Sequence, residues 1–184
     1  MKRAVEATPD KLLQAAASEF NEHGFGGTDT NRIARRAGFA PQTFYRWFDD
    51  KVEIFIEVYE RWQQEEIQVV RKLLAENAGD ARLAQAFVAH HKAFLVFRRS
   101  LRQLSVENDA VRAARARSRL RQIETIKVLS GERTRDDAIL AATLLQIERL
   151  SDALAEGEFV DMGLGKKGGE AALAGLIGSL RKSK

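Results

Sequence analysis

The chain has 184 residues, of which 45% are hydrophobic and 30% are charged. This composition allows a packed core and excludes a globally disordered chain, and the absence of cysteine excludes disulfides, thiol nucleophiles and cysteine metal sites. No apolar run approaches the roughly 18 residues of a membrane span, and the N-terminus lacks an apolar signal core. We therefore expect a cytoplasmic protein without a membrane partner.

The net charge is +4, but it is unevenly distributed. Residues 1–51 carry a net charge of +1, whereas residues 98–121 carry +6. Overall basicity suggests nucleic-acid binding, yet the excess lies in the middle of the chain. Two interpretations of this arginine-rich stretch stay open: a solvated helix face whose arginine stems cover apolar surface, or attraction of an acidic ligand or of DNA.

The first quarter of the chain predicts three helices and the start of a fourth. A first helix begins near Pro9 and ends near Gly24, where glycine favours a stop. A second, short helix ends at Gly38, and a third begins at Pro41. Residues 50–53 have the pattern of a capping box, with Asp at the cap and Glu three residues later, so a long fourth helix begins there.

The rest of the chain repeats the helical pattern and shows no strand alternation. Further helices are expected over residues 80–105 (one helix or two), 109–129, 136–157 and 170–181, with a flexible loop at 163–169. The prediction is an all-α fold of about nine helices, because only two prolines interrupt the chain.

Residues 28–48 are the most informative stretch, because two short helices joined by a glycine-bearing turn predict a helix-turn-helix. Apolar side chains of the first helix can brace the second, which then offers Gln42, Thr43 and Arg46 to a DNA major groove. Glutamine can pair with adenine, arginine with guanine, and the threonine methyl group can contact thymine. Tyr45 and Lys51 suit phosphate contacts, although Tyr45 could instead belong to the core.

The segment GFGGTDTNRIARRAGFAPQTFYRWFDDKVEIF, residues 24–55, resembles the DNA-binding domain of TetR/AcrR-type transcriptional regulators. The resemblance covers about residues 8–60 and has no gap. It implies that residues 1–51 form a helix-turn-helix DNA-binding domain, with the motif itself at about residues 29–48. Residues 52–184 would then form a ligand-binding and dimerisation domain, linked to the first by the long fourth helix.

The function implied by the resemblance is sequence-specific transcriptional regulation. The chain would be a homodimeric repressor on a palindromic double-stranded DNA operator, released by an unidentified small-molecule ligand. A constitutive repressor, or an activator without a ligand, is the alternative. An enzyme is not expected, because no phosphate-binding loop or catalytic set is present in the sequence, and no cofactor is implied.

The resemblance also assigns roles to single residues of the helix-turn-helix. Backbone contacts are implied for Thr28, Thr43, Tyr45 and Lys51, and sequence preference for Gln42 and Arg46. The full set of expected DNA-binding residues is Thr28, Asn31, Pro41, Gln42, Thr43, Tyr45, Arg46, Trp47 and Lys51.

Three residues depart from the family pattern in this segment. Asp29 replaces a usual Ser or Thr, and an acid near phosphate is unfavourable unless it caps the helix. Thr30 replaces a usual apolar residue. Trp47 replaces a usual His or Tyr, so only its indole N–H could donate to phosphate.

Residues 83–101 provide the best candidate for a ligand pocket, because aromatic side chains fall near one helical face with polar groups beside them. The expected ligand-binding residues are Phe87, His90, His91, Phe94, Phe97, Arg98 and Arg102. An ordinary core with a satisfied histidine at its edge is the alternative. A metal site is not expected, because adjacent histidines on a helix point about 100° apart and no second ligand follows at helical spacing.

The last two helices combine an apolar stripe with small residues that allow close helix approach. The expected dimer interface consists of Leu140, Leu144, Ile147, Leu150, Leu154, Ala171, Gly175 and Gly178. The resemblance also implies a four-helix bundle made by two such pairs. A two-fold dimer would match half-sites about one DNA turn apart. An ordinary intrachain core is the alternative.

Overall fold

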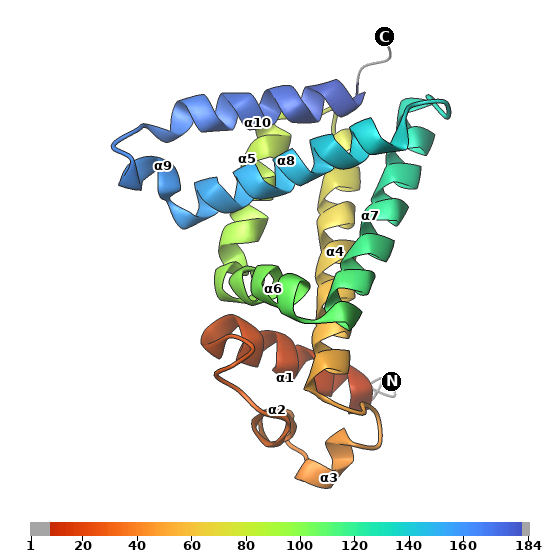
Figure 1. Ribbon diagram of the computed structural model, residues 1–184, viewed down its shortest axis with the longest axis vertical. Coiled ribbons are helices and arrows are strands. Elements are labelled where there is room, and N and C mark those ends of the chain that lie inside the picture. Colours follow the sequence, from red (N-terminus) through yellow and green to blue (C-terminus); the bar gives the residue numbers. More distant parts are fainter. Residues whose placement is uncertain (1–7, 182–184) are drawn as a thin grey trace, which may run out of the picture. The chain divides into compact units, whose positions relative to one another are not determined.

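The computed structural model describes residues 8–181, and every regular element among them is a helix. The all-α prediction is therefore confirmed, with ten helices in place of about nine (Figure 1). In chain order they are α1 (Thr8–His23), α2 (Thr30–Arg36), α3 (Pro41–Phe44), α4 (Lys51–Ala75), α5 (Asp80–Ala93), α6 (Leu95–Glu107), α7 (Asp109–Ser130), α8 (Asp137–Glu156), α9 (Glu158–Asp161) and α10 (Lys166–Arg181).

The helices of the second half follow the sequence expectation, except for an added short helix and an earlier start of the last helix. The segment expected at 80–105 is two helices, because the backbone leaves helical geometry at Phe94, with φ −119° and ψ 33°. Gly157 ends α8 in the left-handed region, with φ 90°, and the chain then turns into the short α9. The last helix begins at Lys166, within the segment expected to be a loop.

The described chain divides into two compact units. Unit 1 contains residues 8–63 and 96–114, and unit 2 contains residues 64–95 and 115–181. Unit 1 therefore includes α1 to α3, the first half of α4, nearly all of α6 and the start of α7. None of the helices described here combines the length and the apolar character that crossing a membrane requires.

Aromatic side chains from three helices fill the core of unit 1. Phe20 of α1 lies edge-on to Phe55 of α4, with ring centroids 5.0 Å apart. Phe55 also contacts Phe97 of α6 at 5.0 Å, and Trp62 of α4 lies 6.5 Å from the same ring. Such pairs add about 0.5–1.5 kcal/mol each beyond the area they bury. Residues of α6 thus complete the core that supports the helix-turn-helix.

The core of unit 2 lies among α5, α8 and α10, which pack against one another. Its buried members include Leu83 of α5, Leu154 of α8 and Leu173 of α10. Two glycines permit close contacts here. A Cβ added to Gly178 would lie 2.6 Å from Asp80 Oδ2, and one added to Gly169 would lie 2.8 Å from the Phe159 ring.

Candidate nucleic-acid interface

Local signals explain where α2 begins and ends. Asp29 is the N-cap of α2, and its Oδ1 accepts a hydrogen bond from the backbone N–H of Arg32 at 2.8 Å. An acid at this position is therefore a helix cap, which is the role that favours it. After α2, Gly38 adopts φ 81°, a conformation that glycine takes without steric cost, and the chain turns toward α3.

The inner side of the helix-turn-helix is apolar. Ile33 and Ala34 of α2 and Phe44 of α3 are fully buried, and Phe48 is 7% exposed. The rings of Phe44 and Phe48 lie 5.6 Å apart. This packing fixes α3 against α2, so the side chains on the opposite side of α3 have a defined direction.

The outer side carries the polar and aromatic residues expected to contact DNA. Gln42 and Arg46 are exposed, Tyr45 is 57% exposed and Trp47 is 52% exposed. Tyr45 is therefore not a core residue. Asn31 is also exposed, whereas Pro41 and Thr43 are half-buried.

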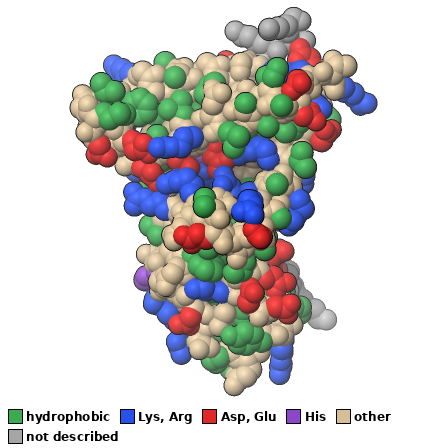
Figure 2. All heavy atoms as spheres, viewed as in Figure 1, with side chains coloured by type: hydrophobic (Ala, Val, Ile, Leu, Met, Phe, Trp, Pro, Cys, Tyr) green, Lys and Arg blue, Asp and Glu red, His purple; other side chains and the backbone are tan. Residues whose placement is uncertain are grey.

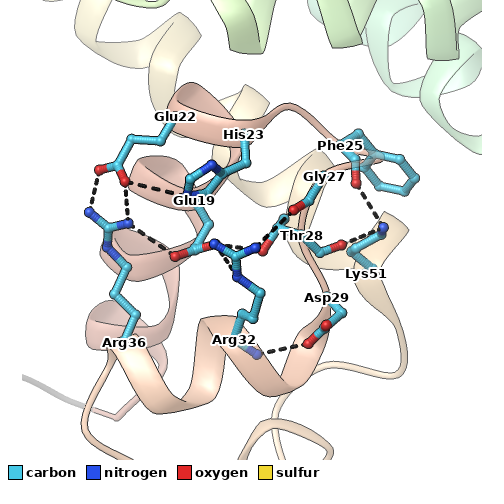
Figure 3. Close-up of polar contacts among 10 residues, drawn as sticks. All are labelled: Glu19, Glu22, His23, Phe25, Gly27, Thr28, Asp29, Arg32, Arg36 and Lys51. Carbon is cyan, nitrogen blue, oxygen red and sulfur yellow. Dashed lines mark hydrogen bonds and ion pairs between the residues drawn. The ribbon is translucent and has the colours of Figure 1, made fainter.

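The other two expected contact residues, Thr28 and Lys51, have their polar atoms bonded inside unit 1. The Thr28 hydroxyl donates to Glu19 Oε2 at 2.6 Å, and Thr28 is buried. Lys51 Nζ donates to the carbonyls of Phe25 and Thr28 at 2.7 and 2.9 Å and lies 4.1 Å from the Phe25 ring centroid (Figure 3). Burial lowers the pKa of Lys51. Contacts of Thr28 and Lys51 with DNA phosphate stay a prediction. Within the chain, both residues hold the segment before α2 in place.

A buried carboxylate links α1 to α2. Besides the Thr28 hydroxyl, Glu19 accepts from Arg36 Nη1 at 3.0 Å and pairs with Arg32 Nε at 3.3 Å (Figure 3). Burial alone would raise the pKa of Glu19, but the hydrogen bonds from Thr28 and Arg36 and the charge of Arg32 lower it overall. Glu22 pairs with both terminal nitrogens of Arg36, one of which also bonds Glu19. Sequence analysis missed this cluster, although an acid on the apolar face of α1 was a usable signal.

The expected ligand-binding residues do not share one helical face, because the chain bends at Phe94 between α5 and α6. Phe97 and Arg98 are buried in unit 1, where the Arg98 guanidinium lies 4.7 Å from the Trp62 ring. Arg102 is half-buried in the same unit. The expectation of a single aromatic face is thus corrected, since these residues belong to two helices and to two units.

The expected ligand-binding residues of α5 belong to unit 2. Phe87 is half-buried against its core, and the His90 and Phe94 rings lie 5.5 Å apart. His91 is buried, with Nδ1 2.8 Å from Asp152 Oδ1 and Nε2 3.2 Å from Glu66 Oε1. These contacts join α4, α5 and α8, so His91 has a structural role whether or not a ligand binds.

The apolar stripe expected at a dimer interface lies inside the chain. Leu140, Leu144, Ile147 and Leu154 are buried and Leu150 is half-buried, within clusters formed with other helices of unit 2. Gly178 is buried beside Asp80. In one chain these residues are therefore core, as the alternative of an ordinary intrachain core expects, and a dimer interface at these residues stays a prediction. Ala171 and Gly175, in contrast, are exposed on α10.

The fold and this site together define a class: all-helical proteins with an N-terminal helix-turn-helix. Within that class, residues 12–58 match the family model of bacterial regulatory proteins, tetR family. The N-terminal helix-turn-helix of this chain is therefore of the TetR-family type.

Two relatives match about a third of the chain. The uncharacterized HTH-type transcriptional regulator YdgC of Bacillus subtilis (strain 168) is 36% identical over 67 residues, which are 36% of this chain and 34% of that protein. The HTH-type transcriptional repressor SCO4008 of Streptomyces coelicolor is 37% identical over 59 residues, or 32% of this chain and 31% of that protein. The chain thus matches about a third of the length of each relative.

The fold of the whole chain is also found among solved structures. A Rhodococcus sp. protein assigned to the TetR family of transcriptional regulators has a TM-score of 0.70 at 17% identity, covering 95% of this chain and 98% of that one. At this identity the likeness concerns the fold alone. This likeness in fold covers the helices of both units and not the helix-turn-helix alone.

Proposed function

We propose that this chain is a sequence-specific DNA-binding repressor that acts as a homodimer and is released from its operator by a small molecule. The observation that carries the proposal is the division of the helix-turn-helix into two sides. Its apolar side is packed, whereas Gln42, Tyr45, Arg46 and Trp47 are exposed on and just after α3. A helix that presents such groups can enter a major groove and contact base edges.

The charges of α2 limit how much of the affinity comes from phosphate attraction. Arg32 and Arg36 are paired with Glu19, whereas Arg35 and Arg46 are exposed and form no ion pair within the described residues. Each phosphate that a protein neutralises adds about 0.9 to the slope of log affinity against log salt. A head with few unpaired cations should therefore show a shallow salt dependence, and base contacts should carry much of its specificity.

A second copy of the chain would cover the exposed face of α8 and α10. On α8, Leu145 is 55% exposed, and Ala142 lies one turn before it. On α10, Ala171 and Gly175 are exposed, and nothing lies within 4 Å of a Cβ added to Gly175. Figure 2 shows hydrophobic side chains over this part of unit 2 on the viewed face. Small residues beside a large apolar one allow two helix pairs to approach closely and form a two-fold bundle.

Half-buried aromatic groups in α5 and at its C-cap support a ligand site in unit 2. Phe87, His90 and Phe94 all keep part of their surface exposed, and aromatic walls with a few polar groups are typical of small-molecule sites. Ligand binding would favour one of two arrangements of the dimer and so change DNA affinity. A constitutive repressor, or an activator without a ligand, is the alternative.

Selection from a random pool of duplex DNA tests the central proposal. The purified chain should enrich a two-fold symmetric sequence at moderate salt, and no enriched sequence would contradict DNA-binding regulation. A thermal-shift screen of lipophilic and anionic compounds tests the ligand. A compound that stabilises the protein should also lower its affinity for the selected DNA. Stabilisation with unchanged DNA affinity, or no stabilising compound, would favour the alternative.

A further inference from the structure

A pair of hydroxyl groups joins the two helices of the helix-turn-helix on its outer side. Thr30 Oγ1, on the first residue of α2, lies 2.9 Å from the phenolic oxygen of Tyr45, which follows α3. The Tyr45 ring packs edge-on against Phe44 at 5.3 Å, yet 57% of the residue stays exposed. The ring is thus held at its base by Phe44 and at its tip by Thr30.

The chemistry of two hydroxyls leaves one proton for an outside acceptor. Each hydroxyl donates one hydrogen bond and accepts up to two. If Thr30 donates to Tyr45, the proton of the phenol is unused, and the bond it accepts makes it a stronger donor. In this arrangement the Tyr45 phenol is the free donor, at a fixed position beside the exposed side chains of α3.

We propose that Thr30 is a positioning residue, which holds the Tyr45 hydroxyl so that the pair donates one hydrogen bond to a DNA phosphate. The proposal rests on the DNA-binding function proposed above. An exposed tyrosine that must be immobilised on binding loses rotamer freedom, and this loss weakens the affinity. Thr30 removes part of that cost before DNA arrives. An apolar side chain at position 30 could not do so, because it has no hydrogen-bonding group.

A double-mutant cycle tests this role. Thr30→Val keeps the shape of the side chain and removes the hydroxyl, Tyr45→Phe removes the phenolic oxygen, and the double variant removes both. Affinity is measured by fluorescence anisotropy on the duplex that the wild type selects. We expect each single variant to bind about three- to tenfold more weakly. The double variant should bind no more weakly than Tyr45→Phe alone, because Thr30 acts only through Tyr45.

Thr30→Ser serves as the matched control, since it keeps the hydroxyl and loses only the methyl group. It should bind DNA like the wild type, and the melting temperatures of all variants show whether they are folded. Three results would each overturn the proposal. Thr30→Ser and Thr30→Val could lose the same DNA affinity, or Thr30→Val could lose none. Thr30→Val could also lower the DNA affinity of the Tyr45→Phe variant as much as it lowers that of the wild type. A folded wild type that selects no DNA would overturn both this inference and the proposed function. If the wild type binds its selected DNA and Thr30→Val binds it equally well, the inference about Thr30 is overturned and the proposed function is not.

Discussion

The Thr28 hydroxyl donates to Glu19 across 2.6 Å inside unit 1. The bond connects the last turns of α1 to the residue that precedes the N-cap of α2. Because Thr28 also accepts a hydrogen bond from Lys51 through its carbonyl oxygen, one residue ties together three helices of the head. The stability of the head therefore depends on a carboxylate that has to stay ionised.

Glu19→Gln should reduce the dependence of stability on acid pH. The pKa of Glu19 is lowered in the folded chain, so its contribution is present above its ordinary pKa and is lost as pH falls through the folded value. Between about pH 7 and pH 4 the wild type should lose more of its unfolding free energy than Glu19→Gln does, by up to roughly 0.6 kcal/mol, because an ordinary glutamate of the unfolded chain takes up its proton near the end of this range. Urea unfolding at both pH values measures the difference. The control is Glu22→Gln, because Glu22 is an exposed partner of the same Arg36. Its loss of unfolding free energy between the two pH values should be closer to that of the wild type.

Gln42→Ala and Tyr45→Phe should affect DNA binding in different ways. Both residues are exposed, so neither change should alter stability by more than about 0.5 kcal/mol. Gln42→Ala should relax the preference at one base position, with a loss of about 1–3 kcal/mol for the preferred base. Tyr45→Phe should weaken binding to all sequences by a similar factor. Selection on a random duplex pool measures both effects. If Tyr45→Phe changed the base preference and Gln42→Ala weakened binding to all sequences alike, the assignment of base and phosphate contacts would be refuted.

Gly169→Ala and Gly168→Ala should change the stability of unit 2 in opposite directions. At Gly169 a Cβ would lie 2.8 Å from the Phe159 ring and 2.9 Å from Leu154 Cδ2, whereas at Gly168 nothing lies within 4 Å. Overpacking should outweigh the helix gain at Gly169 and cost about 1 kcal/mol net. Gly168→Ala should add about 0.5–1 kcal/mol through helix propensity. Two similar unfolding free energies in denaturant titrations would contradict the close packing at Gly169.

Leu145→Glu should convert the proposed dimer to a monomer. The side chain is exposed on α8 in one chain, so the substitution should leave the fold intact. A charge buried in a helix-pair interface without a partner costs several kcal/mol. Sedimentation equilibrium gives the mass in solution. Leu120→Glu, at a 60% exposed position on α7, is the control and should not change the mass; a dimer that survives Leu145→Glu would exclude this face as the interface.

Local features of the head could be predicted because their causes are local. Asp29 caps α2, Gly38 turns the chain and Pro41 begins α3, and each of these effects involves residues within four positions. The hydrogen bond between His91 and Asp152 joins residues 61 positions apart. No pattern along the chain indicates such a partner, and the same holds for the pair formed by Thr30 and Tyr45.

The face of α8 illustrates a second limit on prediction. A stripe such as Leu140, Leu144 and Ile147 has the same spacing whether it packs against helices of its own chain or against a partner. The structure shows it in the intrachain core with α7, α5 and α10. The break at Phe94 was equally hidden, because no proline or glycine marks it, and it interrupts the helix between His91 and Phe97.

The contact of Phe97 with Phe55 and Trp62 has a consequence for protein engineering. Unit 1 is discontinuous in sequence, so a fragment that ends with α4 lacks the α6 residues that cover two large aromatic rings. Such a fragment would expose apolar surface that the intact chain buries. Exchanging operator specificity between regulators of this kind therefore requires moving α6 together with the helix-turn-helix, or redesigning the rings that α6 covers.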